Sequence, residues 1–147
     1  MTLDAELAKK LCERAQAARA QAYAPYSGFS VGAALLIETH DARQEIVAGV
    51  NVENASYGLT VCAERTAVQL AIASGSRRLL AIAVASGSTP AAPPCGMCRQ
   101  VLVEFADDLP VLLVDGVGSV SETSLAALLP SAFKPALLSQ VAVPKKP

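Results

Sequence analysis

The sequence predicts an α/β fold in which helices cover both faces of a mixed central sheet of about five strands, giving three layers. Short apolar runs, of the kind found in strands buried on both faces, alternate along the chain with helical segments. No linker divides the chain. We therefore expect one domain over residues 1–147, with a frayed tail over about 139–147.

The first part of the chain is predicted to be a helix followed by a hairpin. A leucine recurs at every fourth position near the N-terminus, which predicts a helix over residues 2–22. The near-continuous apolar run 31–37 predicts a strand buried on both faces. Residues 46–52 form a similar run after the polar stretch 38–45, and we expect them to return antiparallel to it.

The rest of the chain is predicted to continue the alternation. Residues 53–60 and 86–94 have loop composition. The expected helices cover residues 61–74, 95–106 and 124–129. The expected strands cover residues 79–85, 110–114 and 117–120.

Charge and hydropathy narrow the class of protein. The chain carries 12 Lys and Arg against 13 Asp and Glu, a net charge of −1, which disfavours a nucleic-acid polymer as partner. The uncharged stretch 79–98 is interrupted by Pro and Gly, so no membrane span is expected, and no signal peptide is visible. We expect a cytoplasmic protein. The 52% hydrophobic content predicts surface buried against other copies.

Three of the four cysteines stand at the starts of predicted helices. Cys95 and Cys98 form a C-x-x-C, a spacing that redox pairs share. Cys62 opens the preceding helix, whereas Cys12 falls on the apolar face of the first helix and is expected to be a buried thiol. The single histidine, His40, lies in a polar stretch and excludes two-histidine zinc sites.

Together these cysteines predict a catalytic zinc site with one ion per chain. Three thiolate ligands from Cys62, Cys95 and Cys98 leave the fourth tetrahedral position open, which is typical of catalytic zinc. Glu64, two residues after Cys62, is placed to handle protons on bound water.

The charge of such a site needs compensation. Three thiolates and Zn²⁺ sum to −1, which weakens the Lewis acid unless positive charge lies nearby. Two helix N-termini supply part of it. Arg65 is expected to donate to a ligand sulfur, and Arg99 and Gln100, which follow Cys98, are further candidates for contacts around the ligands.

Six motifs in order along the chain resemble the homotetrameric zinc-dependent cytidine deaminases. They are Y-x-P-Y-S-x-F at 23–29, VGAALL at 31–36, NVENASY at 51–57, CAERTA at 62–67, PCGMCRQ at 94–100 and LLPSAF at 128–133. The resemblance covers about residues 20–135. It implies a cytidine deaminase-like fold and hydrolysis of cytidine and 2′-deoxycytidine to the uridine forms, with ammonia released by attack of zinc-bound hydroxide at C4.

The resemblance also implies residue roles. Cys62, Cys95 and Cys98 would bind zinc, and Glu64 would carry protons from water to the base and to the leaving ammonia. Residues implied to contact the nucleoside are Phe29 beside it, Asn51 and Glu53 on the ribose hydroxyls, the Ala63 backbone on the base, Tyr57 in the same segment, and Phe133 on a base bound by a neighbouring subunit. The active sites of a homotetramer would therefore be shared.

The sequence is also compatible with three other functions. A blasticidin-S-type deaminase shares the cysteine motifs, although the NVENASY segment argues for a ribose site. A polynucleotide cytosine deaminase would generally carry His in place of Cys62. A structural zinc module would need a fourth protein ligand. One position departs from the family, because Met97 stands where Ala is usual.

Overall fold

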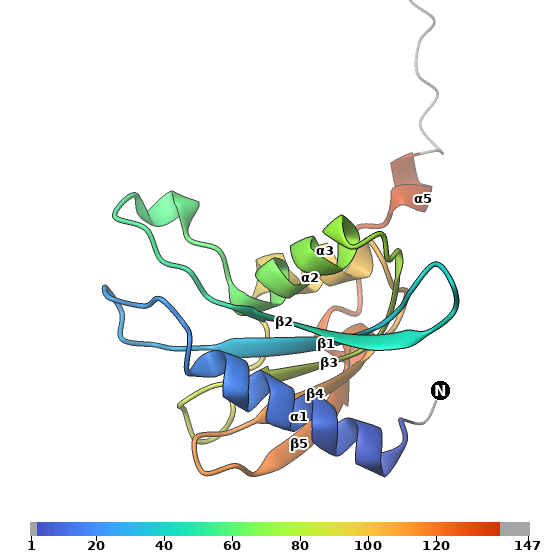
Figure 1. The fold of residues 1–147 in the computed structure, drawn as a ribbon. Coiled ribbons are helices and arrows are strands. Elements are labelled where there is room, and N and C mark those ends of the chain that lie inside the picture. The colour runs from blue at the N-terminus through green and yellow to red at the C-terminus, as the bar shows by residue number, and fades with distance from the viewer. Residues whose placement is uncertain (1–2, 139–147) are drawn as a thin grey trace, which may run out of the picture.

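The computed structural model describes residues 3–138, so the tail expected over 139–147 lies outside the described residues. Its architecture is a five-stranded sheet between helices (Figure 1). The helices are α1 (Ala5–Arg19), α2 (Ala63–Ala73), α3 (Gly96–Val103), α4 (Leu125–Leu128), α5 (Pro135–Leu138) and the single 3₁₀ turn η1 (Tyr57–Leu59). The strands are β1 (Gly32–Glu38), β2 (Gln44–Val50), β3 (Arg78–Ala85), β4 (Pro110–Val114) and β5 (Val120–Ser124).

The strands lie in the order β2-β1-β3-β4-β5. Strand β1 pairs antiparallel with both β2 and β3, so the predicted hairpin is present. Strands β3 and β4 are parallel, and β5 returns antiparallel at the edge. The sheet is therefore mixed, as predicted, and α3 forms the crossover between its two parallel strands.

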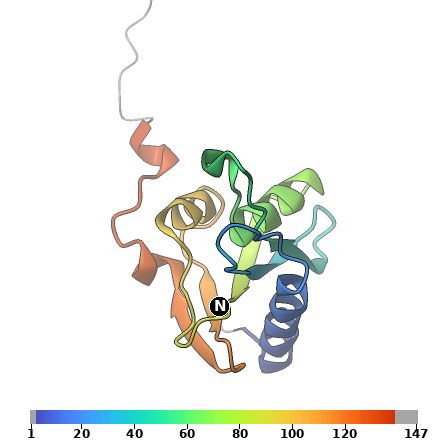
Figure 2. The ribbon, with the colours of Figure 1, turned by 90° about the vertical axis from the view of Figure 1, so that its left-hand side faces the viewer.

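Alternate residues of the central strands face opposite layers, which explains why those strands are apolar throughout. On β1, Leu35 packs with α2 and α3, whereas Leu36 packs with Leu11 and Ala15 of α1. Figures 1 and 2 show α1 on one side of the sheet and α2 and α3 on the other. The three-layer prediction is confirmed.

Element boundaries differ from the prediction where caps and turns intervene. Asp4 accepts hydrogen bonds from Glu6 N and Leu7 N, so α1 begins at Ala5 rather than at residue 2. The expected strand at 117–120 is wrong, because the side chain of Asp115 accepts from Val117 N and Ser119 N and holds that stretch in a turn. The edge strand follows at 120–124 instead.

One close approach positions the helix that carries Cys62. A Cβ atom at Gly49 of β2 would lie 2.4 Å from Ala67 N and 2.6 Å from Ala63 O, so α2 rests directly on the backbone of the strand. Within residues 3–138, no helix has the length and apolar character needed to cross a membrane.

Candidate active site

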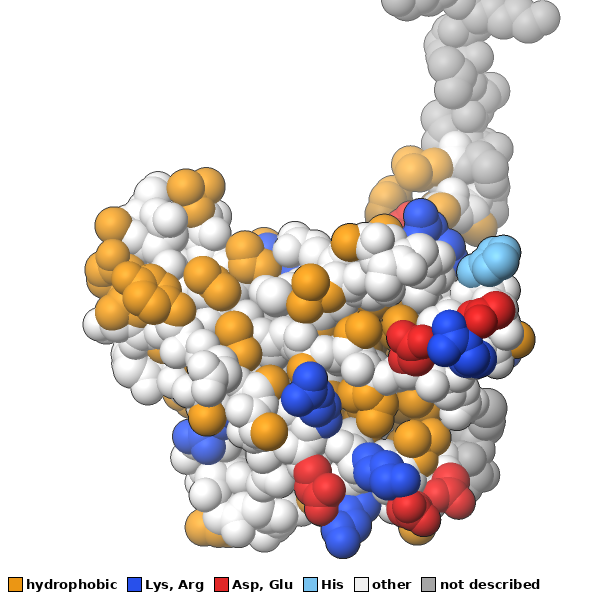
Figure 3. Space-filling model, in the orientation of Figure 1, with side chains coloured by type: hydrophobic (Ala, Val, Ile, Leu, Met, Phe, Trp, Pro, Cys, Tyr) orange, Lys and Arg blue, Asp and Glu red, His pale blue; other side chains and the backbone are white. Residues whose placement is uncertain are grey.

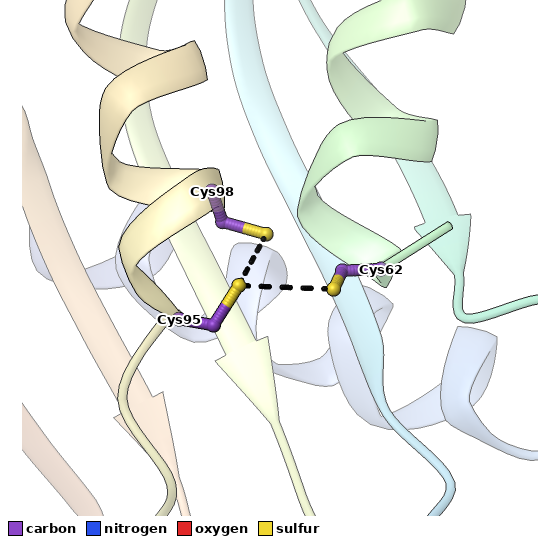
Figure 4. Close-up of side chains that lie close together, drawn as sticks. All are labelled: Cys62, Cys95 and Cys98. Atoms are coloured by element: carbon purple, nitrogen blue, oxygen red, sulfur yellow. Dashed lines mark hydrogen bonds between the residues drawn. The ribbon is translucent and has the colours of Figure 1, made fainter. Parts of the chain in front are cut away.

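The three predicted zinc ligands lie together where α2 and α3 begin (Figure 4). The Cys95 sulfur is 3.8 Å from that of Cys62 and 3.5 Å from that of Cys98, and all three sulfurs lie within 4.8 Å of one another. A tetrahedron with zinc–sulfur bonds of about 2.3 Å has edges of about 3.8 Å. The sulfur spacing therefore fits three corners of a zinc tetrahedron.

The helix starts explain why the sulfurs converge. Cys62 and Cys95 are the N-cap residues of α2 and α3, and both have extended backbone. Their carbonyls accept the first helical hydrogen bonds, from Thr66 N and Arg99 N, while their side chains make no capping bond. Each sulfur is thus free to face the other helix, and Cys98 joins them from the first turn of α3.

A positively charged side chain, that of Arg65, lies beside these sulfurs. The Nη2 atom of Arg65 lies 3.6 Å from the Cys62 sulfur and donates to the Thr60 carbonyl at 3.1 Å, as expected of a residue that offsets thiolate charge. A hydrogen bond from the Cys98 thiol, with help from Arg65, lowers the pKa of Cys62 to about 5. The same partnership and burial raise the pKa of Cys98.

Glu64 is the buried acid of the site. Its side chain lies in the first turn of α2, and the residue is only 4% exposed. Burial raises the pKa of this carboxyl, and the charge at Cys62 raises it further. A buried carboxyl with a raised pKa, beside a metal site, is suited to proton transfer.

A cleft of about 300 Å³ opens in front of these groups. Ala63 and Glu64 of α2 and the sulfurs of Cys62 and Cys95 form one wall. Phe29, Asn51 and Glu53 line the same cleft from two loops that are distant in sequence. The remaining lining residues are Ser27, Val31, Thr60, Val84, Ala92 and Pro93.

The polar residues at the open end are tied to the 26–31 loop. Glu53 accepts hydrogen bonds from Tyr26 N at 2.8 Å, from Ser27 N at 3.2 Å and from the Ser27 hydroxyl. The buried Asn51 accepts from Val31 N and donates to Phe29 O, both at 2.8 Å. The Ser27 hydroxyl and the Tyr26 and Ser27 amides lower the pKa of Glu53, which keeps its carboxylate ionised.

Comparison with known proteins agrees with this geometry. Residues 5–113 match the family described as cytidine and deoxycytidylate deaminase zinc-binding region. The cytidine deaminase of Sporosarcina psychrophila is 45% identical over 135 residues, which cover 91% of this chain and 96% of that protein. The chain belongs to the cytidine deaminase family. In this family of zinc-dependent hydrolases, Cys62, Cys95 and Cys98 form the zinc site.

Two further relatives place the chain within the superfamily. The crystal structure of cytidine deaminase from Burkholderia pseudomallei has a TM-score of 0.79 and 49% identity, and the match covers 85% of this chain and 98% of that one. The blasticidin-S deaminase of Bacillus cereus is 31% identical over 108 residues, 68% of this chain and 74% of that protein. Both the fold and the sequence are thus those of a cytidine deaminase.

Several aromatic and apolar residues are exposed around the mouth of the cytidine deaminase cleft. Tyr57 is 74% exposed and packs edge-on against Tyr26, with ring centroids 5.7 Å apart, so it lies in a neighbouring hollow rather than in the cleft. Apolar side chains gather at this end of the molecule in Figure 3. The exposed large hydrophobic residues of these two loops are Tyr23, Tyr26, Phe29, Val52, Tyr57 and Leu59.

Phe133 and Gln100 lie outside the cleft of their own chain. Phe133 is 57% exposed, and Gln100 donates to its carbonyl at 2.7 Å. Arg99 donates to the carbonyls of Pro94 and Leu128, both at 2.7 Å. The hydrogen bonds of Arg99 and Gln100 thus go to backbone oxygens, whereas Arg65 donates to a ligand sulfur as well as to the Thr60 carbonyl. Met97 points outward and is 62% exposed.

Ser27 and Thr60 also line the cleft, and neither was predicted to have a role there. Ser27 stands inside the first of the six motifs, directly before the Gly28–Phe29 pair, and that position was the available signal. Its partner Glu53 lies 26 residues later, so no local pattern reveals the contact.

Proposed function

We propose that this cytidine deaminase acts on free nucleosides, converting cytidine and 2′-deoxycytidine to uridine and 2′-deoxyuridine in pyrimidine salvage. The C4–N bond breaks, water supplies the new oxygen, and the amine leaves as ammonia. One observation carries the proposal: a buried carboxyl and two of the zinc ligands, Cys62 and Cys95, share a single cleft with the polar pair Asn51 and Glu53. The zinc side suits hydrolysis, and the polar pair suits the hydroxyls of a sugar.

The zinc side of the cleft would perform the chemistry. Cys62, Cys95 and Cys98 would hold one zinc ion, which supplies Lewis-acid activation of water when bound. Glu64 would take a proton from water, deliver it to N3 of the base and assist the departing amine. Its burial and raised pKa support a carboxyl that alternates between both protonation states. Arg65 would stabilise the thiolate of Cys62.

The open side would bind the nucleoside. Phe29 lines the cleft and offers a flat apolar surface beside a nucleoside, while the backbone of Ala63 lies where it can contact the base edge. Asn51 and Glu53 would hydrogen-bond the ribose hydroxyls. Asn51 uses one amide hydrogen and one oxygen lone pair on the 26–31 loop, so it keeps one further donor and one further acceptor for substrate.

A substrate panel tests this proposal. We expect ammonia release from cytidine and 2′-deoxycytidine, with one zinc per chain by metal analysis. CMP should be a poor substrate, because its phosphate would bring negative charge close to the ionised Glu53. Comparable kcat/KM for CMP and cytidine would contradict a nucleoside site, and no ammonia from either nucleoside would contradict the activity.

Two rival functions make different predictions in the same panel. A blasticidin-S-type deaminase would prefer blasticidin S, but the Asn51–Glu53 pair on the cleft supports a sugar substrate. A non-enzymatic zinc module would bind zinc without releasing ammonia from any of these compounds. In residues 3–138 the candidate metal cluster contains three cysteines and no fourth ligand, which favours an enzyme.

The active site is completed, in our proposal, by neighbouring subunits of a homotetramer. Phe133 is 57% exposed and lines no part of its own cleft, and Tyr57 is 74% exposed, so both rings are available to another copy. The Phe133 ring would stack on the base bound by a neighbour. Phe133→Ala should lower kcat/KM by about 5- to 150-fold, since stacking is worth about 1–3 kcal/mol per base. A fully active monomer in light scattering would refute sharing.

The wider setting follows from charge and composition. A net charge of −1 supports a small-molecule substrate rather than a nucleic-acid polymer, and we propose that the protein works in the cytoplasm as a single domain over residues 1–147, without contact with a membrane. Cell fractionation tests the cytoplasmic location, and a binding assay with single-stranded DNA tests whether the protein binds a nucleic-acid polymer.

A further inference from the structure

The segment that carries Phe133 has no helix or strand of its own. Residues 129–134 connect α4 to α5. Contacts with side chains of other segments hold this connection in place. Arg99 donates to Leu128 O at the start of the segment, and Lys134 pairs with Asp107 at 2.8 Å at its end. Between them, the Nε2 atom of Gln100 donates to Phe133 O at 2.7 Å.

These three contacts differ in what they hold. The Lys134–Asp107 pair lies on the surface, with the Asp107 side chain 93% exposed. Exposed ion pairs of this kind contribute little to the stability of a segment. Arg99 fixes a carbonyl five residues before Phe133. Gln100 binds the peptide of Phe133 itself, so it restrains the backbone from which the ring projects.

We propose that Gln100 is a positioning residue: it holds the backbone of Phe133 so that the ring is presented to the base bound by a neighbouring subunit. This inference rests on the proposed function, because it takes from there that Phe133 completes a neighbour's site. Gln100 belongs to α3, the helix that begins at Cys95 and contains Cys98. One helix therefore supports the zinc ligands of its own site and the stacking ring of another.

This role differs from that of a residue that supports the zinc ligands. The Gln100 side chain donates to the carbonyl of Phe133, 33 residues later. The donor to a ligand sulfur, that of Cys62, is Arg65. Loss of the Gln100 bond should therefore change how tightly substrate binds and leave zinc in place. Loss of stacking that is equal in the ground and transition states raises KM and leaves kcat unchanged.

The first experiment removes the donor at constant side-chain length. Gln100→Met should raise KM for cytidine by about 3- to 10-fold, the range for one lost hydrogen bond, with kcat and zinc content unchanged. Gln69→Met is the matched control, because Gln69 is exposed on α2 and its side chain makes no hydrogen bond among residues 3–138. The control should keep the wild-type KM.

A double-mutant cycle with Phe133→Ala decides whether Gln100 acts through the ring. If it does, adding Gln100→Met to Phe133→Ala changes KM no further. Additive losses, loss of zinc in Gln100→Met, or an unchanged KM would each overturn the positioning role. If Phe133→Ala alone keeps wild-type kinetics, the shared site of the proposed function fails instead, so the two failures are distinguishable.

A spectroscopic readout checks the position of the ring directly. The chain contains no tryptophan, so Phe133→Trp introduces a single indole that can be excited apart from the three tyrosines. In an active Phe133→Trp protein saturated with a non-hydrolysed nucleoside, Gln100→Met should lower the fluorescence anisotropy and shift emission to the red. Identical spectra with and without Gln100 would show that the hydrogen bond does not hold the ring.

Discussion

The two halves of the cleft are built in different ways. On the zinc side, Ala63 and Cys98 are completely buried and Glu64 nearly so, because all three belong to helices packed on the sheet. On the sugar side, Glu53 is only partly buried and the 26–31 loop has no regular structure. That loop is held by hydrogen bonds that Glu53 accepts from Tyr26 N and that Asn51 donates to Phe29 O.

This difference separates chemistry from recognition. Core packing holds the zinc side, and a displaced helix would cost apolar contacts as well as the ligand geometry. The sugar side depends on a few polar contacts between loops, each worth about 1 kcal/mol. The first half should therefore resist local changes and fail abruptly when its ligands are removed, whereas the second should weaken gradually.

The largest expected effect comes from removing a ligand on the zinc side. Cys62→Ala should abolish both zinc binding and activity, because two thiolates seldom hold a catalytic zinc ion. Metal analysis and an ammonia assay measure both. Cys12→Ala is the matched control, since Cys12 is a buried cysteine of α1, on the other face of the sheet from the three ligands. A full zinc content in Cys62→Ala would contradict the ligand assignment.

The next effect separates the proton carrier from the ligands. Glu64→Gln should keep the fold and the zinc ion while kcat falls by at least ~10²-fold, the loss typical for a missing general acid–base group. Steady-state kinetics and metal analysis measure the two quantities. Glu104→Gln, the same change at an exposed position after α3, should have wild-type turnover. Near-normal turnover in Glu64→Gln would mean that this buried carboxyl has no part in the reaction.

How much the sequence predicts follows the same division. Glu64 follows Cys62 by two residues and Cys98 follows Cys95 by three, so helix geometry brings each pair together at a helix start, and both the sheet and the zinc cluster could be predicted. The meeting of the two helix starts depends on the fold, because Cys62 and Cys95 lie 33 residues apart. The strand 120–124 was missed because Ser121, Glu122 and Thr123 give an edge strand no apolar alternation. The partners of Ser27 and Gln100 lie 26 and 33 residues away, and such contacts leave no periodic signal.

A third variant tests whether packing holds the zinc side. Gly49→Ala would place a Cβ atom 2.4 Å from Ala67 N, and backbone cannot yield as a flexible side chain can. Overpacking of this kind costs about 1–3 kcal/mol in the free energy of unfolding. Denaturant unfolding measures it, and zinc affinity should fall because α2 must shift. Gly58→Ala on the sugar side is the matched control, since a Cβ atom there meets nothing within 4 Å. Equal stabilities for the two variants would show that α2 does not depend on this contact.

The smallest expected effect belongs to the sugar side and depends on pH. The Ser27 hydroxyl and the Tyr26 and Ser27 amides hold the pKa of Glu53 below its ordinary value of 4.5. Because the pKa is lowered in the folded state, Glu53 contributes stability that is fully present above about pH 4.5 and is lost as the pH falls through the lowered value.

The Tm of the wild type should therefore exceed that of Glu53→Gln by a constant margin at neutral and mildly acidic pH. Below about pH 4.5 the margin should shrink, because the wild-type carboxyl becomes neutral as well. Measuring both proteins in the same buffers cancels the protonation of the zinc ligands, which the two share, and Glu122→Gln controls for the loss of one exposed charge. A margin that grows as the pH falls would mean that the three donors do not stabilise the ionised carboxylate.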